Sequence, residues 1–176
     1  MLFSERSVWT MVHGIGLGGA ALLGLAAALF YLYAARPAPY SNNPETGSRA
    51  FAVVTVFSSV MLWLTVIVGT YIIFPPYRVT PPPGTADLSE FPRAMILASA
   101  DTAWLHAFAM ETKEHMPWIA AMLTTAVAFI GVRYRRTALA DALMRQMTLT
   151  FLALSFILVS FVSLLGVFVN KVAPLH

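Results

Sequence analysis

The fourth apolar run of the chain decides the fold class: residues 147–170 read MTLTFLALSFILVSFVSLLGVFVN. The run contains no Asp, Glu, Lys, Arg or His. A helix needs about 20 predominantly apolar residues to cross the hydrocarbon core of a bilayer. The stretch therefore predicts a transmembrane helix.

Three further runs have a similar character, over about residues 8–35, 50–74 and 116–132. The second of these also lacks charged residues and histidine. The third is short, but its upstream side is largely apolar, so we predict the end of a longer helix that is kinked where it enters through residues 106–117. The expected fold is a single transmembrane domain over residues 1–176, an all-α, integral membrane four-helix bundle.

The composition excludes a soluble domain and gives no sign of nucleic-acid binding. Of the 176 residues, 59% are hydrophobic and 11% are charged, with a mean hydropathy of +0.74. Soluble domains carry about 25% charged residues. The 11 Lys and Arg residues give a net charge of +3, but they lie at the ends of apolar runs rather than in one patch. That pattern is typical of membrane orientation signals. The absence of cysteine excludes disulfides, iron–sulfur clusters and thiolate metal sites.

Helix breakers separate the second run from the third. Pro75-Pro76 ends the second run, and the prolines of residues 81–83 favour an extended backbone, because consecutive prolines cannot continue a helix. Ser89-Glu90 then begins an amphipathic stretch that continues to about His115. We therefore expect residues 75–115 to form an amphipathic or extended segment outside the bilayer.

The basic residues predict an orientation. The strongest cluster is Arg133-Tyr134-Arg135-Arg136, with Arg145 nearby, between the third and fourth runs. Cytoplasmic loops are enriched in Lys and Arg, so this connection is expected in the cytoplasm. Both termini and the segment 75–115 then lie outside. The localisation that we expect is the bacterial inner (plasma) membrane.

Ionisable residues close to the apolar runs are the candidate functional residues. An unpaired charge in a membrane costs at least ~2.5–3.5 kcal/mol, so such residues are functional candidates by default. His13 lies in the first run, and His106, Glu111, Glu114 and His115 precede the third. With both helix starts on the outer side, His13 and His115 would lie at comparable depth.

Spacing indicates what these residues can do. Gly14 and Gly18 follow His13 as a GxxxG pair, which either packs against another helix or leaves room for a flat macrocycle. At about 100° per residue, Glu111 and His115 share one helix face. Glu111 could then accept the ring N–H of a ligating His115. His106 lies about 180° from His115, so one regular helix cannot bring both to one small metal ion.

The leading hypothesis is a b-type cytochrome subunit of an oxidoreductase, for electron transport between a quinone pool and a partner at the outer face. Haem b would lie between the first and third helices, with His13 and His115 as axial ligands and His106 as the substitute for either. Arg78 could meet the haem propionates. The general plan resembles the small cytochrome b anchor subunits of respiratory enzymes, in architecture alone.

Two alternatives remain open. One is a non-haem site for iron, copper or zinc, or for protons, which would draw its ligands from the imidazoles and carboxylates His13, His106, His115, Glu111 and Glu114. The other is an accessory subunit without a cofactor, whose helices pack against a larger membrane complex or a second copy. Its Ser and Thr hydroxyls would bond back to their own helices. In each case the chain fits a subunit in a lipid bilayer better than a stand-alone enzyme.

Overall fold

The computed structural model describes residues 4–34 and 44–173, and most of these residues are helical. No strand occurs among them. Four helices are long and apolar enough to cross a membrane, over Glu5–Ala34, Thr46–Tyr77, Ala100–Ala140 and Ala142–Val172. The predicted all-α class with four such helices is confirmed.

Each of the first three long helices contains a π-helical segment. The first comprises α1 (Glu5–Met11), η1 (Val12–Gly18) and α2 (Gly19–Ala34). The second comprises α3 (Pro44–Val68), η2 (Gly69–Ile73) and α4 (Phe74–Tyr77). The third comprises α6 (Ala100–Trp104), η3 (Leu105–Met110) and α7 (Glu111–Ala140), and the fourth is α8 (Ala142–Val172). The short helix α5 (Pro92–Leu97) precedes α6.

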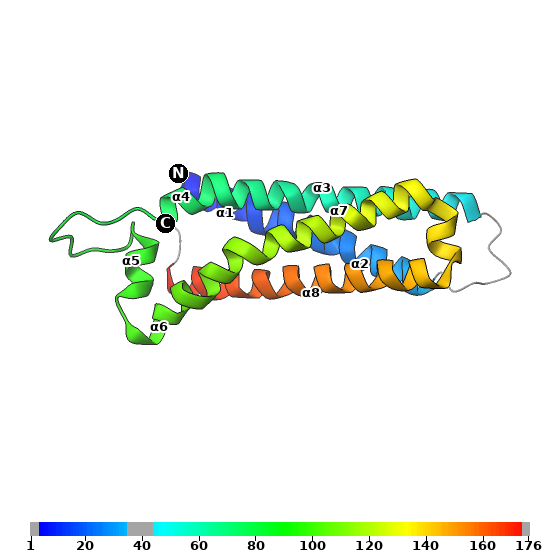
Figure 1. Cartoon of the computed structure of the whole chain (residues 1–176). Helices are drawn as coiled ribbons and strands as arrows, with labels where there is room; N and C mark the ends of the chain where they lie inside the picture. The colour runs from blue at the N-terminus through cyan, green and yellow to red at the C-terminus, as the bar shows by residue number, and fades with distance from the viewer. Residues whose placement is uncertain (1–3, 35–43, 174–176) are drawn as a thin grey trace.

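The long helices form an elongated bundle with two distinct ends (Figure 1). α2 packs against α3, α3 against α7, α7 against α8, and α8 against α2. The start of α1, the end of α8 and the short helices α4, α5 and α6 lie at one end, here called the termini end. The turn between α7 and α8 lies at the opposite end, here called the basic end because it carries the arginine cluster. The three π-helical segments all lie towards the termini end, and π-helical turns often occur at functional sites.

The bundle core combines small apolar residues with buried hydroxyls. In α2 the core positions recur at helical spacing, at Ala21, Leu25, Ala28 and Leu32. Most of the hydroxyls bond back to carbonyls of their own helices, as predicted: Ser58 donates to Val54 (2.7 Å), Thr148 to Met144 (2.7 Å) and Ser155 to Phe151 (2.8 Å). Ser59 instead shares a hydrogen bond of 3.2 Å with Thr125 of α7. These groups are therefore buried without losing their hydrogen bonds.

The third long helix extends upstream of the apolar run at 116–132, as expected, and begins at Ala100. Its irregular turn is the π-helical η3, and α7 continues through Pro117. The basic cluster is part of this helix, and its backbone departs from helical geometry at Arg135 (φ 40°, ψ −109°). The chain then reverses at Asp141, whose carboxylate accepts a hydrogen bond from the Met144 N–H (2.7 Å) and caps α8.

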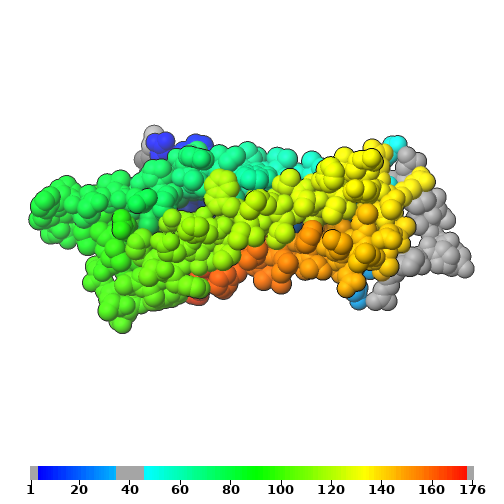
Figure 2. Space-filling view, in the orientation of Figure 1, coloured from blue at the N-terminus to red at the C-terminus, as the bar shows by residue number. Residues whose placement is uncertain are grey.

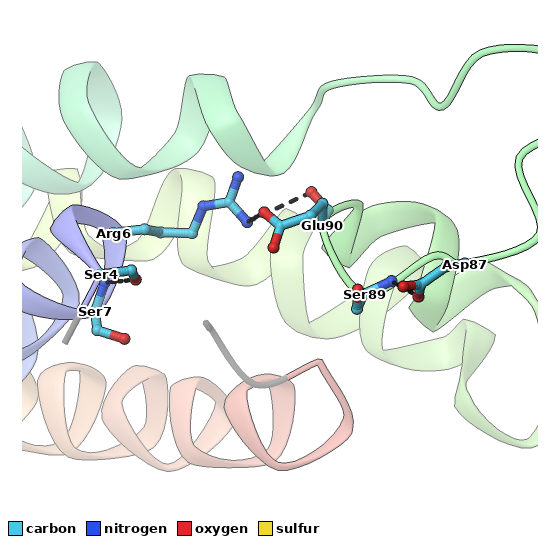
Figure 3. A network of polar contacts seen from close by, with 6 residues as sticks. All are labelled: Ser4, Arg6, Ser7, Asp87, Ser89 and Glu90. Atoms are coloured by element: carbon cyan, nitrogen blue, oxygen red, sulfur yellow. Dashed lines mark hydrogen bonds and ion pairs between the residues drawn. The ribbon is translucent and has the colours of Figure 1, made fainter. Parts of the chain in front are cut away.

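The connection between α4 and α5 is tied to the first helix. Arg6 of α1 lies 3.8 Å from the Glu90 carboxylate and donates to the Glu90 carbonyl at 3.4 Å. The Ser89 N–H donates to the Asp87 carboxylate at 2.9 Å, which forms a local turn beside this contact (Figure 3). The connection therefore has a defined position at the termini end.

Candidate functional site

A polar cavity lies at the termini end. It has a volume of about 110 Å³, is partly open, and is lined by Phe74, Arg78, Arg93, His106, Glu111 and Glu114. These residues come from α4 and the residue after it, α5, η3 and α7. In the space-filling view, the green side chains of this region form one end of the elongated molecule (Figure 2). Four residues predicted as site residues (Arg78, His106, Glu111 and Glu114) therefore line one space, although they come from three different elements.

Tyr77 orients the histidine of this cavity. Its hydroxyl shares a hydrogen bond of 3.0 Å with His106 Nδ1, and the ring centroids are 6.0 Å apart. Tyr77 is only 7% exposed and packs with Ile96 and Leu105. This packing fixes the position of the hydroxyl that contacts His106. Because Nδ1 is occupied, Nε2 is the ring nitrogen that remains available to another partner.

The charged side chains that line the cavity form no ion pairs or hydrogen bonds with one another in the described part of the chain. The Arg78 guanidinium lies 5.4 Å from the centre of the Phe74 ring. Arg93 Nε is buried and has no hydrogen-bond partner within the described part of the chain. Over residues 4–34 and 44–173, the carboxylates of Glu111 and Glu114 form neither an ion pair nor a hydrogen bond. Donors and acceptors without partners thus face a common space, which fits a polar ligand.

His13 lies inside the bundle, apart from this cavity. Its ring packs against Gly69 of η2, where a Cβ atom would lie 2.7 Å from ring Cε1. Its Nδ1 atom is buried and has no hydrogen-bond partner in the described residues. Lys113 of α7 is close enough to act on the ring electrostatically, and its Nζ would lie 3.2 Å from a Cβ on Gly166 of α8. His13 and Lys113 therefore form a basic layer between the helices.

His115 points away from that layer. It is exposed, and its Nδ1 lies 2.8 Å from the backbone carbonyl oxygen of Glu111. A carbonyl only accepts, so Nδ1–H is the donor and a neutral ring carries its free lone pair on Nε2. The two residues do share a face, but the acceptor is the Glu111 backbone rather than its carboxylate. Lys113 and His115 are about 200° apart around α7, so one faces inwards and the other outwards.

The structure therefore places His13 inside the bundle and His115 on its surface. The two glycines of the GxxxG pair have different surroundings. A Cβ on Gly18 would lie 3.8 Å from Thr65 Cγ2 of α3, whereas Gly14 has no neighbour within 4 Å.

The predicted metal ligands are distributed over three places. His106, Glu111 and Glu114 line the cavity, His13 lies in the bundle, and His115 lies on the surface. Within residues 4–34 and 44–173, no three His, Cys, Asp or Glu side chains are placed so that they could hold a metal ion.

The second cavity is lined almost entirely by apolar side chains, with Tyr31 as the one residue that carries a polar group. It has a volume of about 260 Å³ and lies between α2 and α3, lined by Ala27, Ala28, Phe30, Tyr31, Ala34, Ala50, Phe51 and Val54. Such a lining suits hydrocarbon rather than a reacting group.

Tyr77, Arg93 and Lys113 belong to this region of the structure but were not predicted as site residues. Tyr77 and His106 are 29 residues apart and are joined across a segment rich in proline, so no local spacing links them. Arg93 had no signal beyond its charge. The position of Lys113 could have been inferred from Gly166, because a glycine in an apolar helix often marks a close approach.

Comparisons with known proteins identify no family for this chain. No protein-family model, no curated protein and no solved structure matches it. Its function therefore has to be argued from the chemistry of the cavity.

Proposed function

We propose that this chain is a membrane subunit of a larger oxidoreductase complex and binds a quinone head group in the polar cavity at the termini end. The observation that carries the proposal is the set of donors and acceptors without partners around one cavity, supported by the Tyr77–His106 hydrogen bond. A partner subunit would hold the redox centre that exchanges electrons with the quinone.

The lengths of the helices support a position at a membrane boundary. Twenty residues separate Arg49 from Gly69, and twenty separate Lys113 from Arg133. At 1.5 Å per residue this is about 30 Å, the thickness of a hydrocarbon core. If the arginines of the basic end mark one boundary, the layer of His13 and Lys113 marks the other, and the cavity lies next to it. A quinone head attached to an isoprenoid tail is expected at this depth.

The size of the cavity limits the ligand. A closed apolar cavity of about 150 Å³ accepts benzene. A partly open cavity of about 110 Å³ therefore fits a single ring, part of which remains at the mouth. A haem macrocycle is too large for it.

Quinone oxygens suit the arginines and the histidine of the lining. The oxygens can accept hydrogen bonds from Arg93 and Arg78, and His106 can use its free Nε2. Binding in this way would give the Arg93 guanidinium an acceptor for its terminal N–H groups. A hydrogen bond to a charged group contributes about 1.5–3 kcal/mol.

Binding of a short-tailed quinone to the purified full chain in nanodiscs tests the proposal. We expect saturable binding, and His106→Ala and Arg93→Gln should each weaken it about tenfold or more, the loss expected for a hydrogen bond to a buried group. Arg145→Gln at the basic end is the matched control for Arg93→Gln and should leave the affinity unchanged. A photoreactive quinone should label peptides from residues 74–114. Labelling only at lipid-facing positions of α8 would refute the proposal.

A second candidate function, the b-type cytochrome, is favoured by one observation. A ligating histidine usually donates its second ring N–H to a carbonyl or carboxylate, and His115 has this arrangement with Nε2 free at the surface. His115 would then hold a haem outside the bundle, between this chain and a partner or a second copy.

A visible absorption spectrum of the chain, expressed with adequate haem, tests this candidate. Sharp bands after reduction are expected, and His115→Ala should abolish them while His13→Ala leaves them intact. Loss of the bands in His13→Ala would contradict the surface position and would favour the axial pair predicted from the sequence. A protein without a Soret band would remove the candidate.

A further inference from the structure

The lining of the cavity is divided by hydrogen-bonding capacity. Arg78 and Arg93 flank the connection between α4 and α5, and guanidinium groups only donate. Glu111 and Glu114 both project from the first turn of α7, and carboxylates only accept. A ligand that satisfies both kinds of group must accept hydrogen bonds from the arginines and donate hydrogen bonds to the carboxylates.

We infer that the cavity selects the reduced, hydroquinone form of the ring over the oxidised quinone, an inference that rests on the proposed function. A quinone carbonyl only accepts hydrogen bonds, whereas a hydroquinone hydroxyl both donates and accepts. The arginines can donate to either form. The carboxylates can pair only with the hydroxyl, because two acceptors that face one another leave both without a partner.

The glutamates are the discriminating groups because His106 cannot discriminate. The Tyr77 hydroxyl can donate to Nδ1 or accept from it. In the first case Nε2 of the neutral ring carries the proton and donates, and in the second it accepts. His106 therefore meets either form of the ligand equally well, and Tyr77 acts as its positioning residue.

The two cavity carboxylates have no internal hydrogen-bond partners among the described residues, which supports this selectivity. Neither Glu111 nor Glu114 has an ion pair or a hydrogen bond in the described parts of the chain, so no internal partner would have to be displaced. Glu90, by contrast, lies on the connection outside the cavity and is engaged by Arg6 at 3.8 Å. The two cavity carboxylates are thus ready to accept from an incoming hydroxyl.

The experiment compares the affinities of one short-tailed quinone in its two redox forms, under anaerobic conditions, for the full chain in nanodiscs. Wild type should bind the hydroquinone about tenfold tighter or more, because the ring displaces water from the half-buried Glu114 carboxylate and only a hydroxyl replaces that hydrogen bond. Glu114→Gln should bring the ratio close to one, because an amide both donates and accepts. Arg93→Gln should weaken both forms and keep the ratio. Tyr77→Phe should also affect both forms alike. Glu90→Gln is the matched control and should change neither affinity.

Each outcome has a defined meaning. Equal affinities in wild type, or an unchanged ratio in both Glu114→Gln and Glu111→Gln, would overturn the selectivity while the proposed quinone site stands. Absence of binding by either form would overturn the proposed function itself. Thermal unfolding of each variant identifies those that fail to fold. If Glu114→Gln fails to fold, Glu111→Gln is the deciding variant.

Discussion

Polar side chains of this bundle lie where glycines of a neighbouring helix leave space. The Ser58 hydroxyl lies against Gly24, the Thr55 hydroxyl against Gly131, the His13 ring against Gly69, and the Lys113 ammonium against Gly166. A missing Cβ lets a polar group reach deep between helices and lets the backbones approach closely. The same device thus serves both helix packing and the placement of the basic layer.

Alanine at Gly24 should destabilise the bundle, whereas alanine at Gly19 should not. A Cβ at Gly24 would collide with Ser58, while Gly19 has no neighbour within 4 Å. Overpacking costs about 1–3 kcal/mol, which lowers the unfolding temperature by about 2–12 °C for a chain of this size. Gly19→Ala should instead gain up to about 1 kcal/mol of helix propensity. Thermal unfolding in one detergent compares the two variants, and equal shifts would contradict this packing.

The sequence predicts which residues belong to the site more reliably than it predicts which of them lie together in space. His106, Glu111, Glu114 and Arg78 were predicted and do line one cavity. The pairing of His13 with His115 rested on equal depth along two helices. Depth does not specify rotation about the helix axis, and the rotation of α7 directs Lys113 inwards and His115 outwards. Which of two nearby residues faces a neighbouring helix is decided by packing.

At the scale of elements, the long third helix shows what hydropathy can detect. Hydropathy marks residues 116–132 and their largely apolar upstream side, which predicts a longer helix but not its bounds. The helix covers Ala100–Ala140, because charged residues also form good helices where they need not be buried. The spacing of apolar residues in the sequence does not predict the π-helical segments. A π-helical turn holds about one residue more than an α-helical turn, which rotates the following side chains without any change in composition. These segments set the rotation of His13 and His106, which is why their neighbours could not be predicted.

Glycine at Arg135 should be neutral or stabilising, in contrast to glycine elsewhere in α7. Arg135 has φ 40° and ψ −109°, a conformation that a side chain disfavours. Relief of this strain is worth about 1 kcal/mol or more. Val132 lies one turn earlier in regular helix and is 49% exposed, so Val132→Gly should cost about 0.5 kcal/mol, since valine is itself a weak helix former. Chemical unfolding followed by circular dichroism measures both, and a clear loss of stability in Arg135→Gly would contradict this backbone geometry.

At the scale of the whole molecule, the basic residues are unevenly distributed along the chain. Residues 35–49 and 133–145 together contain six of the 11 basic residues and two of the eight acidic ones. The remainder of the chain carries five basic and six acidic residues. Short segments rich in Lys and Arg stay in the cytoplasm. The basic end is therefore expected in the cytoplasm, and the cavity on the outer side.

Cysteine labelling can test this orientation without background, because the chain contains no cysteine. Ala98, before α6, and Ala140, at the end of α7, are both exposed and lie at opposite ends of the bundle. In spheroplasts, a membrane-impermeant maleimide should label Ala98→Cys directly and Ala140→Cys only after permeabilisation. Ala121→Cys, at a position that is 0% exposed, is the control and should react only after denaturation. The reverse pattern would move the cavity to the cytoplasmic side, and labelling of both end positions in intact spheroplasts would contradict a bundle that spans the membrane.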